Sequence, residues 1–165
     1  MSTATFTFET VAWEDARAVA LRQLMDTEMN ERYRRPEPEP AEVVAKRQLS
    51  LAVDPALVKA TVLVLDADGT PLAHAALRVL RGDWEVKRVI VVDGQRGRGI
   101  GRALMNHLEE IATVGGAPRL ILQTGDRQPD AVALYERVGY TPIAIYEPYV
   151  ETIPGSFCFE KVITR

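Results

Sequence analysis

Gln95-Arg-Gly-Arg-Gly-Ile-Gly-Arg-Ala103 places a glycine at every second position of a basic run. The run follows an apolar strand pattern at residues 89–92 and precedes a helical pattern. Glycine has no Cβ, so the backbone N–H groups of such a turn can approach an anion closely, and the N-terminus of the next helix adds positive charge at the same place. The stretch therefore predicts a strand–turn–helix unit that cradles a phosphate group.

On both sides of this turn, strand and helix patterns alternate. Strands are predicted at residues 5–11, 60–65, 72–80, 84–92, 120–124, 143–146 and 156–162. Helices are predicted at residues 13–33, 41–52, 104–112 and 130–138. The three prolines of residues 35–40 prevent a helix there and predict a surface loop. The resulting order, βααβββαβαββ, indicates an α/β (α+β) fold.

Length and composition limit the class of protein. The 165 residues suffice for one buried core, and 47% hydrophobic with 26% charged residues are typical of a globular domain. No run approaches a membrane span and the start lacks a signal-peptide layout, so a cytoplasmic protein is expected. Cys158 is the only cysteine and His74 and His107 are the only histidines, so neither a disulfide nor a metal site is expected. The formal charge of −3 argues against a nucleic-acid partner.

Two common phosphate-binding motifs do not match the glycine turn. A P-loop requires a Lys-Ser/Thr pair after its last glycine, whereas Arg102-Ala103 follows Gly101 here. A dinucleotide-binding motif has the spacing GxGxxG on the first strand–helix turn, with an acidic residue about 20 positions later. Here the spacing is GxGxG, the turn follows the fourth strand, and the region near Ile121 is apolar. A turn that holds the pyrophosphate of an acyl-CoA is the remaining candidate.

Two blocks of sequence support that candidate. Arg96-Gly-Arg-Gly-Ile-Gly101 has the pattern Arg/Gln-x-x-Gly-x-Gly/Ala, and Val91-Val-Asp93 precedes it, with aspartate where Val-x-Pro is usual. Gln128-Pro-Asp-Ala-Val-Ala-Leu-Tyr135, followed by Gly139-Tyr140, has the pattern Asn-x-x-Ala-x-x-Leu-Tyr then Gly-Tyr/Phe, with glutamine for asparagine. In both pattern and order these blocks resemble the GNAT superfamily of acyl-CoA-dependent N-acyltransferases. The resemblance covers about residues 84–140, and the first 80 residues match only in layout.

The resemblance implies a fold, an activity and a cosubstrate. The expected fold is a mixed, mainly antiparallel sheet of six to seven strands flanked by about four helices, within a single N-acetyltransferase domain over residues 1–165. The expected enzyme uses acetyl-CoA, needs no metal and transfers the acetyl group directly in a ternary complex. Members of the family often dimerise through their closing strands, so a homodimer is one expectation.

The resemblance also implies which residues hold the cosubstrate. The fourth strand is expected to part from the fifth beyond Val91, so that its backbone can pair with the pantetheine amides like an added strand. Backbone amides of the turn would hold the pyrophosphate, and its arginines would neutralise that group or the ribose 3′-phosphate. A solvated helix start is the alternative for each arginine. The expected cosubstrate residues are Ile90, Val91, Val92, Arg96, Gly97, Arg98, Gly99, Ile100, Gly101, Arg102 and Gln128.

Two side chains are candidates for the chemistry. An alkylamine with a pKa near ~10 is only about 0.1% neutral at pH 7, so a general base is useful. In the resembled family a glutamate on the fourth strand often has that role, and Glu85 stands at the corresponding position. The tyrosine of the Leu-Tyr pair, here Tyr135, directs its hydroxyl at the CoA sulfur in that family and can protonate the leaving thiolate. The alternatives are a solvated Glu85 paired with Lys87 or Arg88, and a Tyr135 that only packs in the core.

The acceptor is the least defined part of the prediction. Residues 26–42 would cover the acceptor cleft in this fold and carry six acidic side chains, at Asp26, Glu28, Glu31, Glu37, Glu39 and Glu42. They suggest a small, cationic primary amine, and a solvated charged surface is the alternative. An acyl-CoA sensor without turnover, a protein or peptide N-acetyltransferase, and an interaction protein with a vestigial glycine turn are the other functions considered.

Overall fold

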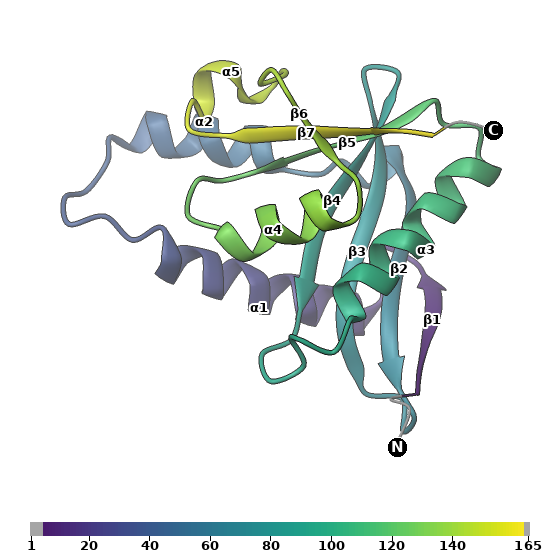
Figure 1. Cartoon of the computed structure of the whole chain (residues 1–165). Helices are drawn as coiled ribbons and strands as arrows, with labels where there is room; N and C mark the ends of the chain where they lie inside the picture. The colour runs from purple at the N-terminus through teal and green to yellow at the C-terminus, as the bar shows by residue number, and fades with distance from the viewer. Residues whose placement is uncertain (1–4, 164–165) are drawn as a thin grey trace.

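The computed structural model of the chain describes residues 5–163. Within these residues one seven-stranded sheet has the strand order β1-β2-β3-β4-β5-β7-β6 (Figure 1). Neighbouring strands are antiparallel except β4 and β5, which run parallel. The strands are β1 (Phe6–Val11), β2 (Val58–Asp66), β3 (Pro71–Leu80), β4 (Asp83–Val91), β5 (Arg119–Thr124), β6 (Thr141–Ile143) and β7 (Phe157–Val162).

Helices follow the predicted order, and two short ones are added. The helices are α1 (Ala16–Arg32), α2 (Ala41–Leu51), α3 (Ile100–Val114), α4 (Pro129–Arg137), α5 (Tyr149–Thr152) and the 3-10 helix η1 (Pro55–Leu57). The sequence did not predict α5 or η1, because a helix of one turn is too short to show a 3.6-residue period. None of the described helices is long and apolar enough to cross a lipid bilayer.

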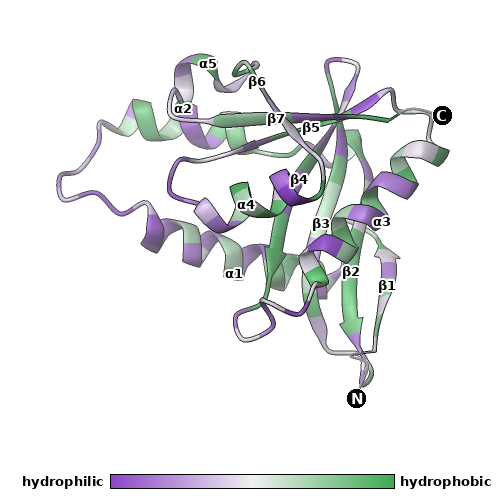
Figure 2. Cartoon of the chain, viewed as in Figure 1, coloured by the Kyte–Doolittle hydropathy of each residue, from purple (hydrophilic) through white to green (hydrophobic). Residues whose placement is uncertain are grey.

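The sheet is buried on both faces by different helices. Val62 and Val64 of β2 belong to the main core, which includes residues of α3 and α4. Leu63 and Leu65, which point to the opposite face, pack in a second cluster with residues of α1. Coverage of both faces explains why the central strands are continuous apolar runs. Figure 2 shows β2 and β3 as mainly hydrophobic and the loop between α1 and α2 as hydrophilic.

The predicted strand at residues 143–146 is wrong by two residues at its start and three at its end. In the structure β6 covers Thr141–Ile143, and Ile143 is its last residue paired with β7. The chain then leaves the sheet, and the hydroxyl of Tyr146 donates a hydrogen bond of 2.5 Å to Glu85 on β4. A contact with a distant strand therefore overrides the local apolar pattern.

The separation of β4 from β5 begins earlier than predicted. The parallel pairing ends with Val86 opposite Leu122, so the expected parting beyond Val91 is wrong. The register between β3 and β4 shifts directly afterwards, between His74 and Ala76, and Arg88 has a φ of 58°. This β-bulge adds a residue to β4 where the two strands diverge. Residues 87–91 consequently have no strand pairing with β5 in the described part of the chain.

Candidate active site

A cavity of about 600 Å³ lies where β4 has parted from β5. Its walls come from α1, the end of β4, the glycine turn with the start of α3, and α4. Most of the residues predicted to bind the cosubstrate therefore meet in one place. The predicted residues in its lining are Ile90, Val91, Arg96, Gly97, Gly99, Ile100, Gly101, Arg102, Gln128 and Tyr135.

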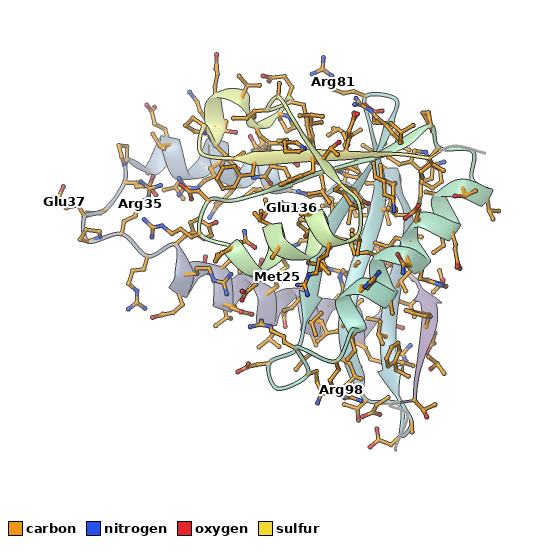
Figure 3. All side chains as sticks on the ribbon, in the orientation of Figure 1. Met25, Arg35, Glu37, Arg81, Arg98 and Glu136 are labelled. Atoms are coloured by element: carbon orange, nitrogen blue, oxygen red, sulfur yellow. The ribbon has the colours of Figure 1, made fainter. Side chains whose placement is uncertain are left out.

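Three predicted site residues lie outside this lining. The N–H of Val92 donates a hydrogen bond of 2.9 Å to the carbonyl of Leu72, so β3 already uses that backbone donor. The guanidinium of Arg98 donates to the side-chain oxygen of Gln95 within the turn. Figure 3 shows Arg98 on the glycine turn, away from Met25. Glu85 is the third and lies in a separate network.

The glycine turn has the backbone conformation that only glycine adopts easily. Gly97 and Gly99 have φ values of 84° and 77°, and Gly99 is the N-cap of α3. Apart from the glycine and its chain neighbours, no atom of the described residues lies within 4 Å of the position that a Cβ would take at either glycine. Gly101 has no positive φ, and its added Cβ would lie 3.1 Å from Cδ2 of Leu134. The turn is thus open to an anion, next to the first N–H groups of α3, which have no partner within the helix.

Tyr135 is held rigidly on the α4 side of the cavity. Its side chain is 7% exposed, and its ring lies 6.1 Å from that of Tyr140 and 6.3 Å from that of Phe159. Burial raises the pKa of its hydroxyl, which therefore stays protonated at neutral pH. Among the described residues no hydrogen-bond partner for this hydroxyl is found. Tyr135 is thus a protonated, packed residue in the lining of the cavity.

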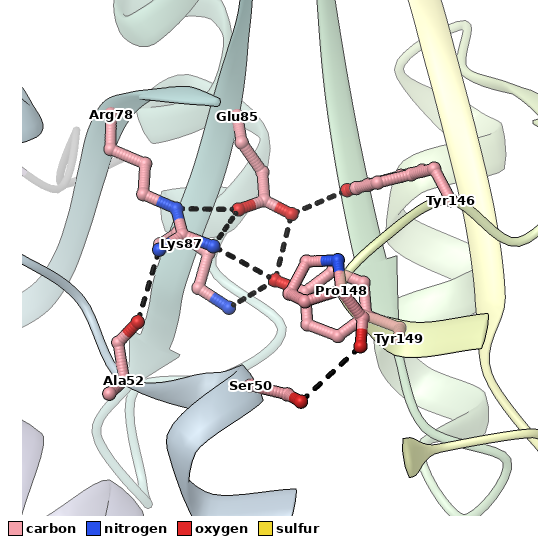
Figure 4. A network of polar contacts seen from close by, with 8 residues as sticks. All are labelled: Ser50, Ala52, Arg78, Glu85, Lys87, Tyr146, Pro148 and Tyr149. Carbon is pink, nitrogen blue, oxygen red and sulfur yellow. Dashed lines mark hydrogen bonds and ion pairs between the residues drawn. The ribbon is translucent and has the colours of Figure 1, made fainter. Parts of the chain in front are cut away.

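Glu85 lies in a buried polar network that joins three parts of the chain (Figure 4). The residue is fully buried, and its Oε1 accepts a hydrogen bond of 2.8 Å from Nε of Arg78 on β3. Its Oε2 accepts from the hydroxyl groups of Tyr146 at 2.5 Å and Tyr149 at 3.0 Å. The carboxylate is thereby fixed in position by one arginine and two hydroxyl donors.

The expected alternative for Glu85, a solvated carboxylate paired with Lys87 or Arg88, is wrong. Lys87 is itself buried, and its Nζ donates to the hydroxyl of Tyr149 at 3.0 Å. Desolvation lowers the pKa of Lys87 to about 8, although the charge of Glu85 opposes the shift. The bulge turns Arg88 toward α1, where its Nη1 lies 2.6 Å from Oδ1 of Asp26.

His74 supports the bulge that separates the strands. Its Nδ1 lies 2.8 Å from the carbonyl oxygen of Arg88, and its Nε2 lies 3.0 Å from Nη1 of Arg22. A carbonyl only accepts, so Nδ1 carries the proton and Nε2 accepts from Arg22. Burial, followed by the charges of the nearby arginines, lowers the pKa of His74 to about 4. His74 is thus fully buried within the sheet, and nothing in the sequence indicated its contact with the bulge.

Four lining residues lie on α1, and of these the sequence had indicated only Glu28, as part of the acidic segment over the acceptor cleft. Met25, Glu28, Met29 and Arg32 all border the cavity. Their spacing of three, four and seven positions is that of one helix face, and this signal was present in the sequence. It could not be used because the sequence does not show which face of α1 is turned toward the cavity.

Residues 26–42 are largely neutralised by arginines. Four of the six acidic side chains in that segment form ion pairs, which join Asp26 with Arg88, Glu28 with Arg32 and Arg96, Glu31 with Arg34, and Glu39 with Arg35 and Arg47. The segment therefore presents much less uncompensated negative charge than its composition suggests, which favours the charged-surface alternative.

Comparison with known sequences identifies the class of protein. The sequence model of the acetyltransferase (GNAT) family matches residues 19–140. The chain therefore belongs to the GNAT acetyltransferase family, a family of acyltransferases.

Three similar proteins illustrate its place in the family. An IAA acetyltransferase of Azospirillum brasilense is 35% identical over 53% of this chain and 58% of that protein. A mycothiol acetyltransferase of Beutenbergia cavernae is 36% identical over 51% of this chain and 29% of that protein. Among solved structures, a candidate acyl-CoA N-acyltransferase of Klebsiella pneumoniae is 26% identical with a TM-score of 0.78, over 98% of this chain and all of that one. The matched region spans between about a third and a little over half of the two curated relatives.

Proposed function

We propose that this protein transfers the acetyl group of acetyl-CoA to a primary amine of a small molecule, by direct transfer in a ternary complex. The observation that carries the proposal is the cavity whose lining includes both the glycine turn and Tyr135. One end is suited to a pyrophosphate and the other to a leaving thiolate.

The residues that line the cavity support acetyl-CoA as the donor by their chemistry. The backbone of Gly97 and Gly99 is open to a diphosphate, and Arg96 and Arg102 border the same space. The unpaired stretch of β4 offers Ile90 and Val91 as backbone partners for the pantetheine amides. Gln128 at the start of α4 completes this wall.

The proposed reaction needs a proton acceptor and a proton donor. The neutral amine attacks the thioester carbonyl, the carbon–sulfur bond breaks, and the thiolate takes the proton of the Tyr135 hydroxyl. Tyr135 is suited to this step by its position, because it lines the cavity and its ring is fixed by packing. It regains a proton from solvent after the products leave.

Glu85 is the proposed acceptor of the amine proton. Because it is fully buried, the proton must reach it through another group. We place this transfer through water or through Tyr146, whose hydroxyl oxygen lies 2.5 Å from Oε2 of Glu85. The oxygen of that water or of the Tyr146 hydroxyl accepts the amine proton and at the same time passes its own proton to the carboxylate of Glu85.

A panel of acceptors tests the proposal. The full chain would be incubated with acetyl-CoA and polyamines, aminoglycosides, amino acids or peptide N-termini, and thiol release measured. We expect acceptor-dependent release with at least one small primary amine. Release confined to peptides would point to a protein N-acetyltransferase, and CoA binding without release would point to a sensor. Either result would contradict the proposed acceptor class.

A further inference from the structure

Glu28 places a carboxylate between two arginines inside the cavity. Its Oε1 lies 2.7 Å from Nη2 of Arg96 and 3.4 Å from Nη2 of Arg32. All three side chains border the cavity and are partly exposed, at 30% for Glu28 and Arg32 and 43% for Arg96. A single oxygen thus occupies a position where two guanidinium groups converge, an arrangement that also suits a phosphate oxygen.

Arg96 makes a second contact that the cosubstrate would have to share. Its Nε donates a hydrogen bond of 3.2 Å to the carbonyl oxygen of Val91. That carbonyl is the last of β4 and belongs to the stretch without a partner on β5. With one end on Val91 and the other on Glu28, Arg96 lies across the end of the strand rather than toward the glycine turn.

We propose that Glu28 is an internal competitor for Arg96, and that a phosphate group of CoA displaces its carboxylate when the cosubstrate binds. Glu28 thereby weakens the binding of CoA and favours its release. This inference rests on the proposed function, because it requires that the cavity binds CoA.

The competition follows from charge. A phosphate that reaches Arg96 must replace an existing ion pair and lie close to a carboxylate of like charge, and both effects oppose binding. The contacts are partly exposed, so solvent moderates them. Substitution of Glu28 by the neutral, isosteric glutamine removes both effects and leaves both arginines in place.

Calorimetric titration with CoA tests the inference on the full chain. We expect Glu28→Gln to lower the dissociation constant about 3- to 10-fold relative to wild type. Glu31→Gln is the matched control, because Glu31 lies on the same helix, pairs with Arg34 at 2.7 Å and does not border the cavity. Its dissociation constant should match wild type within about 1.5-fold, since distant exposed charges are screened.

Two further arms identify the groups involved. In an Arg96→Gln background, Glu28→Gln should increase the affinity for CoA by less than it does in the wild-type background. An undiminished increase there would overturn the role of Arg96. The same comparison is made with 3′-dephospho-CoA as the ligand. If Glu28→Gln still increases the affinity, the diphosphate is the group that displaces the Glu28 carboxylate; if the increase is lost, that group is the 3′-phosphate.

The outcomes separate this inference from the proposed function. Unchanged or weaker CoA binding by Glu28→Gln, with wild type binding CoA, would overturn the competition alone. Failure of the wild-type chain to bind CoA at all would overturn the proposed function and the competition together.

Discussion

At the scale of single residues, the two proposed catalytic side chains have opposite surroundings. Tyr135 lines the cavity, and its hydroxyl has no hydrogen-bond partner among the described residues. Both carboxylate oxygens of Glu85 are occupied, by Arg78 on one side and two tyrosines on the other. In the proposed reaction Tyr135 therefore acts directly, whereas Glu85 acts through a neighbouring group.

Tyr135→Phe isolates the proton donor. Only the hydroxyl is lost, so we expect kcat to fall about 10- to 100-fold with the dissociation constant of CoA retained. Tyr140→Phe is the control, because the Tyr140 hydroxyl is buried and has no hydrogen-bond partner among the described residues. That variant should keep its activity and be at least as stable as wild type. Steady-state kinetics is the measurement. If both variants had the kcat of wild type, Tyr135 would not be the proton donor.

Glu85→Gln tests the proton acceptor. We expect a lower kcat and a free energy of unfolding reduced by about 1–3 kcal/mol, because the amide cannot satisfy Arg78 and both tyrosines as the carboxylate does. Circular dichroism would establish that the variant is folded at the assay temperature. A folded variant with unchanged kcat at saturating concentrations of both substrates would exclude Glu85 as the base.

At the scale of elements, two glycines of the glycine turn differ in what they require: Gly99 requires an unusual backbone conformation, and Gly101 requires only space for a side chain. Gly99 has a φ of 77°, whereas Gly101 has no positive φ, and a Cβ added at Gly101 would be crowded mainly by the side chain of Leu134. We expect Gly99→Ala to weaken CoA binding at least about 10-fold, through backbone strain and a methyl group in the anion's path. Gly101→Ala should change it less than about 3-fold. Calorimetry on both variants is the check, and equal losses would contradict the assigned geometry.

The bulge in β4 depends on a histidine that must stay neutral. The pKa of His74 is about 4 in the folded protein and about 6.5 when unfolded, so between these values only the unfolded chain binds the proton. Its contribution to stability is complete above about pH 7 and is lost as pH falls toward 4.

Denaturant unfolding at two pH values tests this dependence. We expect wild type to lose about 2 kcal/mol of unfolding free energy between pH 7 and pH 5 through His74, in addition to any loss from other groups. His74→Gln, which does not titrate, should lose correspondingly less over the same interval. Identical losses in both proteins would show that His74 is not buried in the neutral form.

At the scale of the whole molecule, the features of the fold and of the site that depend on local sequence patterns could be predicted. The order of elements followed from apolar periodicity, and the glycine turn and Tyr135 followed from short motifs. The surroundings of Glu85 could not be predicted, because Arg78, Tyr146 and Tyr149 come from separate segments that only the sheet brings together. The early parting of β4 from β5, and the bulge at Arg88 that directly follows it, likewise have no local signature in the sequence.

A crystal structure of the full chain with acetyl-CoA tests the central claim, that the cavity between the glycine turn and α4 holds the donor. We expect the diphosphate against the backbone amides of residues 97–102. The thioester sulfur should lie within about 3.5 Å of the Tyr135 hydroxyl oxygen. A cosubstrate bound outside this cavity, or one whose sulfur lies far from Tyr135, would contradict the account.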